Sequence, residues 1–416
     1  MRVMRRRRPP RLLLTPLAAC LVVLPAAPAV ADGTDSGTTV ALPVLSSALD
    51  ENQACRKSSP ARATAVPWEQ QSLQLSRTWR FASGSGVTVA VVDTGVSVKA
   101  PALKGRVTAA GEAGADCVGH GTFVAGLVAA AASEGIGFAG VAQKTRILGV
   151  RGTDVRGSAT AATVASGIRT AVARGADVVS VSAALPSGSA ALTSAVKEAV
   201  AHDVLVVAAA VPDAPTGSEA SETAAPAPRD FWPAAQDGVL SVLDVAVDGK
   251  RPTGSYGTNS ADLAAPGDGV VGIGPEGPGH YIGSGASLAA GFAAGAAALV
   301  RSAHPALSAE QTATRLRDTA YPDVVPRLDP YAAVTSVADA SDAAGAPPAA
   351  ERPGPALRLP EDAGAGPAGR AVLIAAVAAG VVLLVAWAAV VVPRGRARGW
   401  RGPGDLARPS REDEAG

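Results

Sequence analysis

One uncharged stretch in the C-terminal half of the sequence limits the folds that the whole chain can adopt. Residues 281–300 carry glycines at positions 283 and 285, then Ser287, and then a long run of Ala, Leu and Val. Glycine permits a tight turn and Ala and Leu favour helix, so the stretch predicts a turn that leads into a buried helix. Ser287 would lie at the start of this helix, where free N–H groups favour negative charge. It is then either a nucleophile or an ordinary helix N-cap.

Upstream of this stretch, apolar β-branched runs alternate with helical patterns. The run at 86–93 is typical of a central strand in a parallel sheet, and it ends in Asp93. Further strands are predicted at 144–150, 177–181, 204–210, 239–247 and 261–265, and helices at 124–132, 159–174, 190–202 and 308–319. This order predicts an α/β fold in which helices flank a parallel sheet.

Three polar residues occupy positions where such a fold presents reactive groups. Asp93 ends the first strand, and the carboxyl ends of parallel strands are where ligands and chemistry gather. His120 lies between two glycines at the start of an apolar helix, and the other three histidines of the chain lack this setting. An aspartate, a histidine and a serine in this order match one known arrangement of the Ser-His-Asp triad.

Residues 1–31 have the pattern of a secretory signal peptide. Six arginines precede an apolar run that ends in Ala29-Val30-Ala31, so cleavage is expected before Asp32. Three prolines interrupt the run, which disfavours a spanning helix. Leu17-Ala18-Ala19-Cys20 offers lipoprotein processing as an alternative.

A second apolar segment, residues 371–392, predicts a single transmembrane helix. A helix of this length spans about 33 Å, which is enough for a bilayer core. Four arginines follow at once, so the positive-inside rule places the tail, 393–416, in the cytoplasm. Residues 341–370 are rich in Pro, Ala and Gly and are predicted to be a linker. The main domain, 81–340, is then expected outside the cytoplasm, at the cell membrane. The alternative for residues 371–392 is a buried helix of a soluble domain.

Two cysteines remain after removal of the signal peptide. In an exported protein, Cys55 and Cys117 are best explained as one disulfide. The bond would tie the N-terminal extension, residues 32–80, to the main domain. The extension is predicted to be irregular from Asp32 to about Pro67. Trp68 and Trp79 are predicted to anchor the same extension by aromatic contacts.

The balance of charge gives no support to a nucleic-acid partner. The chain has 37 Lys and Arg against 36 Asp and Glu. No acidic loop indicates a calcium site, and we assign neither a metal nor a cofactor.

Three segments resemble the signature blocks of the subtilase family of serine proteases. They are Val92-Asp93-Thr94-Gly95, Gly119-His120-Gly121-Thr122 and Gly285-Ala286-Ser287-Leu288-Ala289-Ala290, and Asp262–Gly267 resembles the segment before the serine block. The resemblance implies a subtilisin-like fold and hydrolysis of peptides or proteins through an acyl-enzyme. By the same resemblance Ser287 is the nucleophile, His120 the general base and acid, and Asp93 the group that orients the imidazole.

The wider layout is similar to the mycosins, which are membrane-anchored subtilases of bacterial type VII secretion systems. Shared features are the signal peptide, an extension with a cysteine, Cys117 just before His120, the linker and the C-terminal span. The resemblance implies a type VII secretion membrane complex as a partner.

One departure from the subtilase pattern affects the expected chemistry. Where subtilases have Ala-Ala-Gly-Asn after a strand, this chain reads Ala208-Ala209-Ala210-Val211-Pro212, so Pro212 takes the place of the asparagine that stabilises the oxyanion. Proline has no side-chain donor and no N–H. Neither asparagine of the chain, Asn52 or Asn259, follows this strand. Loss of one oxyanion donor lowers turnover by about 10²–10³.

Smaller departures lie near the substrate. The segment Ser182, Ala183 and Ala184, assigned to substrate binding, differs from the usual family strand, and Ala286 and Gly291 replace the usual Thr and Pro. Two hypotheses remain: a membrane-anchored serine endopeptidase with reduced turnover, or a catalytically impaired scaffold of a secretion complex.

Overall fold

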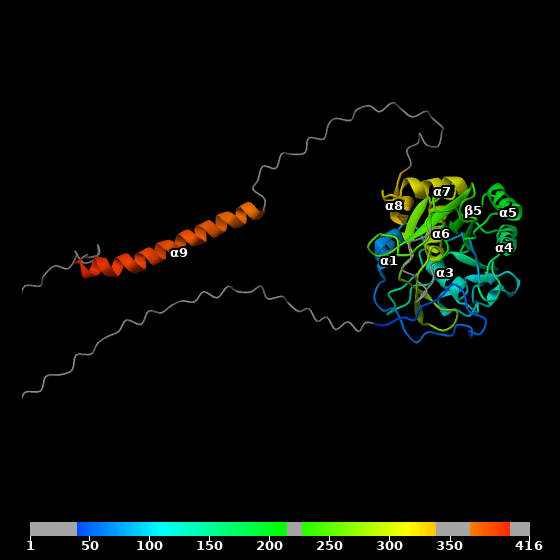
Figure 1. The fold of residues 1–416 in the computed structure, drawn as a ribbon, viewed down its shortest axis with the longest axis horizontal. Helices are drawn as coiled ribbons and strands as arrows, with labels where there is room; N and C mark the ends of the chain where they lie inside the picture. Colours follow the sequence, from blue (N-terminus) through cyan, green and yellow to red (C-terminus); the bar gives the residue numbers. More distant parts are fainter. Residues whose placement is uncertain (1–39, 214–226, 338–366, 400–416) are drawn as a thin grey trace, which may run out of the picture. The chain divides into compact units, whose positions relative to one another are not determined.

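The computed structural model of this chain describes residues 40–213, 227–337 and 367–399. The predicted signal peptide, most of the linker and the end of the tail lie outside these residues. The chain divides into a first unit that ends at Val337 and a second that begins at Ala338, and each is described by itself (Figure 1).

The first unit is built on a seven-stranded sheet in which every neighbouring pair is parallel. The strand order is β2-β3-β1-β4-β5-β6-β7. The strands are β1 (Thr88–Asp93), β2 (Val107–Ala109), β3 (Arg146–Arg151), β4 (Val178–Val181), β5 (Leu205–Ala209), β6 (Val239–Val245) and β7 (Leu263–Pro266). The predicted parallel α/β fold is therefore confirmed.

Helices cover both faces of this sheet, which is why its strands are apolar on both sides. In β1, Val89 and Val91 join the core beneath α3 (His120–Ala129) and α6 (Ala286–Ala303). Ala90 and Val92 join the core beneath α4 (Ala161–Ala173) and α5 (Ala190–Ala201), which lie side by side (Figure 1). Successive side chains of β1 thus point to opposite faces of the sheet and contribute to a separate hydrophobic core on each face.

Helix α6 is the buried helix that the uncharged stretch predicts. It is long and apolar enough to cross a membrane, but 83% of its residues are buried inside the first unit. It packs on α3 and on β4, β5, β6 and β7. This unit also contains α7 (Ala309–Asp318), which begins with a capping box of Ser308 and Gln311, and α8 (Pro330–Thr335). Short 3-10 turns lie at Pro101–Leu103 and Gly111–Gly114.

The topology brings polar residues together at one edge of the sheet. Strands β1, β4 and β5 are neighbours and run parallel, so their carboxyl ends meet at the same edge. Asp93 ends β1, Ser182 follows β4 and Asp213 lies four residues after β5. A hairpin of β8 (Val270–Ile273) and β9 (His280–Gly283) leads into the start of α6.

The N-terminal extension packs against the first unit over its described part. Arg56 N–H donates to the carbonyl of Cys117 at 2.9 Å, beside the predicted disulfide between Cys55 and Cys117, which is present. The indole N–H of Trp68 donates to Gly269 O at 3.2 Å, and that of Trp79 donates to Val141 O at 2.8 Å. Beyond the part predicted to be irregular, the extension contains two short helices, α1 (Trp68–Ser72) and α2 (Leu75–Thr78).

Glu69 of α1 carries a buried carboxyl group with an incomplete set of partners. Its Oε1 accepts from Val271 N–H at 2.9 Å, whereas its Oε2 is buried without a hydrogen bond among the described residues. Burial raises the pKa of Glu69 from 4.5 to about 7. The carboxyl is therefore held in its neutral form over a pH range in which an unfolded chain has already released the proton.

Replacement Glu69→Gln is expected to remove a pH dependence of stability. Between pH 4.5 and about 7 the folded state binds more protons at Glu69 than the unfolded state does. The free energy of unfolding therefore falls as pH rises through this window, by roughly 3 kcal/mol. Denaturant unfolding of the full chain at both ends of the window measures this fall, and Glu112→Gln at an exposed site is the control. An equal fall in the Glu69→Gln variant contradicts the expectation.

The second unit contains one described helix, α9 (Pro367–Ala397). Within it, Ile374–Ala397 has a mean hydropathy of 2.7 and none of its residues is buried, so the segment is a candidate membrane span. The predicted span, 371–392, lies inside α9, but the helix does not end there. It continues through Pro393 to Ala397.

Candidate active site

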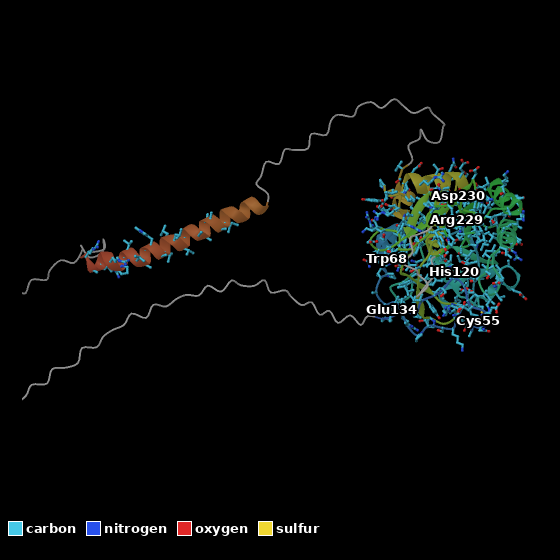
Figure 2. The ribbon with its side chains drawn as sticks, viewed as in Figure 1. Cys55, Trp68, His120, Glu134, Arg229 and Asp230 are labelled. Carbon is cyan, nitrogen blue, oxygen red and sulfur yellow. A yellow bond between two sulfur atoms is a disulfide. The ribbon has the colours of Figure 1, made fainter. Side chains whose placement is uncertain are left out.

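A continuous hydrogen-bonded chain links Asp93, His120 and Ser287. The two carboxylate oxygens of Asp93 lie 3.0 and 2.8 Å from Nδ1 of His120, and Nε2 of His120 lies 3.0 Å from Oγ of Ser287. Asp93 comes from the end of β1, His120 from the first turn of α3 and Ser287 from the first turn of α6. All three side chains are buried, and His120 is labelled in Figure 2.

Opposing effects set the protonation of this buried pair. Burial alone would raise the pKa of Asp93, but the charge of His120 and hydrogen bonds from His120, Ser182 and Thr94 lower the pKa below its ordinary value. Burial lowers the pKa of His120, but the carboxylates of Asp93 and Asp213 raise it by more, to well above 6.5. The arrangement stabilises an imidazolium between two carboxylates.

A close approach of two glycines brings the histidine segment to Asp93. A Cβ atom at Gly121 would lie 2.1 Å from the carbonyl oxygen of Gly95 and 3.0 Å from Cβ of Asp93. Any side chain at Gly121 would therefore push α3 away from the end of β1 and lengthen the distance from His120 to Asp93. The Gly-His-Gly pattern thus has a steric reason.

Asp116 holds the loop before His120 and was not singled out from the sequence. Its carboxylate accepts hydrogen bonds from Thr94 Oγ1 at 2.8 Å, from Gly119 N–H at 2.7 Å, and from Thr122 N–H and Oγ1 at 2.8 and 2.7 Å. Burial raises the pKa of Asp116, and its hydrogen bonds oppose that effect. Its position three residues before Gly119, at the entry to a helix, is the signal that sequence reasoning passed over.

A second carboxylate faces the serine, and it comes from Asp213. Its Oδ1 accepts from the backbone N–H of Ser287 at 3.0 Å, and its Oδ2 accepts from Ser287 Oγ at 2.7 Å. Oδ2 also lies 3.6 Å from His120 Nε2. The side chain opposite Ser287 therefore belongs to Asp213, one residue beyond the position at which the sequence comparison placed Pro212.

Of the segment assigned to substrate binding, one residue contacts the buried pair directly. Ser182 donates its hydroxyl to Oδ2 of Asp93. Ala183 and Ala184 follow it and are half-exposed, with no regular secondary structure. The segment leaves the carboxyl end of β4, next to β1.

The other three histidines lie in separate surroundings. Nδ1 of His280 accepts a hydrogen bond from Ala63 N–H at 3.3 Å, the ring packs edge-on against Phe138, and burial lowers the pKa of His280. His304 Nε2 lies 2.8 Å from Val334 O, and exposed His202 bonds its own helix. His120 alone contacts Asp93 and Ser287 in the part of the chain that the structure describes.

Comparison with known proteins identifies the family of this chain. The sequence profile of the Peptidase S8 subtilase family matches residues 84–352. Subtilisin DY of Bacillus licheniformis is 37% identical over 243 residues, which is 57% of this chain and 84% of that protein. Mycosin-4 of Mycobacterium tuberculosis is 30% identical over 409 residues, covering 86% of this chain and 88% of mycosin-4.

Solved structures give the same result. The serine protease MycP1 of the type VII (ESX-1) secretion system matches with a TM-score of 0.61 and 25% identity, over 71% of this chain and all of that one. A chain of the periplasmic assembly from the ESX-5 inner membrane complex matches with a TM-score of 0.60 and 26% identity, over 77% of this chain and 96% of that one. The protein is a member of the subtilase family and, within it, resembles the mycosins over most of its length.

Proposed function

We propose that this protein is a membrane-anchored serine endopeptidase that acts outside the cytoplasm in association with a type VII secretion membrane complex. The observation that carries the proposal is the chain of contacts from Asp93 through His120 to Ser287. In this site Ser287 is the nucleophile, His120 the general base and acid, and Asp93 the group that orients and stabilises the imidazolium.

The reaction follows from these positions. Oγ of Ser287 attacks the scissile carbonyl and passes its proton to Nε2 of His120, 3.0 Å away. The imidazolium is stabilised by Asp93 at Nδ1 and then gives the proton to the leaving amine. Water, activated by His120, releases the acyl group in the second half of the reaction. The N–H of Ser287, at the first turn of α6, stabilises the oxyanion.

The substrate backbone is proposed to pair with the segment after β4. Ala183 and Ala184 are half-exposed and extend the edge at which Asp93 and Ser287 meet. An extended peptide laid along this segment would place its carbonyl near Ser287.

The cellular location is inferred from both ends of the chain and from the disulfide. Disulfides persist in oxidising compartments, so the bond between Cys55 and Cys117 supports a position outside the cytoplasm. The apolar segment Ile374–Ala397 supports a single membrane anchor, and the arginines near its end support a cytoplasmic tail. The likeness to a chain of the ESX-5 periplasmic assembly supports the complex as a partner.

Hydrolysis of an unstructured protein by the full chain in detergent tests the proposal. The wild type is expected to release peptides by cleavage at a limited set of sites, which mass spectrometry identifies. Ser287→Ala, which removes only the hydroxyl, is expected to release none. Equal cleavage by both proteins, or none by the wild type at any pH, would refute an endopeptidase centred on Ser287.

A scaffold without catalysis is the second candidate, and the carboxylate of Asp213 on the N–H of Ser287 favours it. Such an acceptor occupies a donor that the oxyanion needs. Restoration of secretion in a strain that lacks the protein distinguishes the two. The scaffold requires Ser287→Ala to restore secretion as well as the wild type does. The endopeptidase requires that variant to assemble with the complex and yet fail.

A further inference from the structure

The side chain of Asp213 is largely buried against Ser287 and fills a defined space there. Its side chain is only 10% exposed. A Cβ atom at Gly285 would lie 2.0 Å from Oδ1 of Asp213, so the glycine before α6 leaves the space that this carboxyl fills. Both carboxyl oxygens bond Ser287, one to its N–H and the other to its hydroxyl.

The two protonation states of such a carboxyl have opposite effects on peptide hydrolysis. As a carboxylate it is an acceptor only. It then occupies the N–H of Ser287, holds the hydroxyl proton and repels the negative charge that develops on the substrate oxygen. As a neutral acid it carries an O–H donor, and carboxylic acids held neutral stabilise oxyanions in other enzymes.

We propose that Asp213 is the oxyanion-hole residue of this protease, that it acts as a neutral carboxylic acid, and that its ionised form holds the site shut. The inference rests on the proposed function and adds a residue and a pH control to it. Asp213 takes the place that a side-chain amide fills in other subtilases, but it donates a hydrogen bond only while it is protonated.

The charges of Asp213 and His120 act on each other, since Oδ2 and Nε2 lie 3.6 Å apart. When the pair holds one proton, it has two forms. In the first, protonated His120 faces the carboxylate of Asp213. In the second, neutral His120 faces the neutral carboxylic acid of Asp213. Only the second form has both a general base and an oxyanion donor. Such a pair titrates as a unit. Loss of its proton at higher pH removes the donor, and a second proton at lower pH removes the base.

Other charged groups lie around this pair. Asp93 lies on the far side of His120, and its negative charge holds a proton on the pair. The negative charge of Asp213 reaches Asp244 of β6, and Arg251 forms an ion pair with Asp244. Burial raises the pKa of Asp244, and the charge of Arg251 opposes that effect.

Acylation of Ser287 and release of the amine need no reagent other than the site residues and the substrate. Substrate entry rotates the carboxyl of Asp213 away from Oγ of Ser287. The bond from Oγ to the carbonyl carbon forms, the hydroxyl proton moves to Nε2 of His120, and the oxyanion accepts hydrogen bonds from Ser287 N–H and Asp213 Oδ–H. When the C–N bond breaks, His120 gives its proton to the amine, and Asp213 keeps its own proton throughout.

The rate of labelling by a fluorophosphonate, measured on the full chain between about pH 5 and pH 10, tests the inference without knowledge of the substrate. The wild-type rate is expected to rise and then fall with pH. Asp213→Asn carries a permanent donor of the same shape, so its rate is expected to rise to a plateau without the alkaline fall. At alkaline pH it is expected to exceed the wild type by about 10²-fold.

Two further variants separate charge from hydrogen bonding. Asp213→Ala removes the carboxylate but supplies no donor, so it is expected to lack the alkaline fall and to stay at least about tenfold slower than Asp213→Asn. Asp237→Asn, at an exposed site, is expected to match the wild type. The inference is overturned if Asp213→Asn keeps the wild-type rate and profile, or if Asp213→Ala is as fast as Asp213→Asn. Absence of labelling in every variant, equal to Ser287→Ala, overturns instead the proposed function.

Discussion

His120→Ala is expected to lower kcat for peptide hydrolysis by about 10⁴–10⁶, the loss that follows removal of the general base from a Ser-His-Asp triad. His120 is the residue that contacts both the Ser287 hydroxyl and the Asp93 carboxylate. Without its imidazole the hydroxyl of Ser287 has no base to accept its proton. Ser287→Ala added to His120→Ala is expected to cost little more, because the two act as a unit.

The measurement is steady-state hydrolysis of a peptide that the wild type cleaves, with kcat and KM determined separately. His202→Ala provides a matched control, because His202 is exposed and its imidazole bonds Glu198 O in the preceding turn. The control is expected to keep the wild-type kcat. If His120→Ala retains a tenth of the wild-type kcat, proton transfer through His120 is not part of the reaction.

Asp93→Asn is expected to lower kcat by about 10⁴ with little change in KM. Asparagine has the shape of the aspartate, but its NH₂ group faces Nδ1 of His120 and favours the wrong tautomer. It also removes the negative charge that stabilises the imidazolium and raises the pKa of His120. Because KM reports mainly on substrate contacts away from this carboxylate, the loss should appear in kcat.

A variant that removes one hydrogen bond to the Asp93 carboxylate, but keeps the carboxylate itself, serves as the comparison. Ser182→Ala removes the hydroxyl that donates to Oδ2 of Asp93 but leaves the charge and the contact with His120. Its kcat is expected to fall much less than that of Asp93→Asn. A loss in Asp93→Asn that falls wholly on KM, or a loss no greater than in Ser182→Ala, contradicts an orienting role for Asp93.

The main lines of the fold were predictable because its central elements have strong local patterns. The uninterrupted apolar run before Asp93 is required by a strand buried on both faces, and it forms β1. The uncharged run after Ser287 predicts a buried helix, and α6 is that core helix. Because strands and helices alternate, the residues at strand ends and helix starts meet at one edge, and Asp93, His120 and Ser287 do so.

Other elements depend on contacts that the sequence does not display. The short helix α1 is held by tertiary bonds, such as Glu69 to Val271, and not by its own propensity. The hairpin of β8 and β9 has strands of four residues each, too short for a clear alternation. Asp213 lies in irregular chain after β5, where comparison of motifs has no fixed register and a displacement by one residue selects Pro212.

The most direct test of the central claim is to locate the adduct of a fluorophosphonate on the full, folded chain by mass spectrometry, at the pH of greatest labelling. One adduct is expected, on Oγ of Ser287, and it should be absent from Ser287→Ala and from protein unfolded before treatment. An adduct on a different serine, or none on the folded wild type at any pH, would contradict the account of Ser287 as a nucleophile activated by His120 and Asp93.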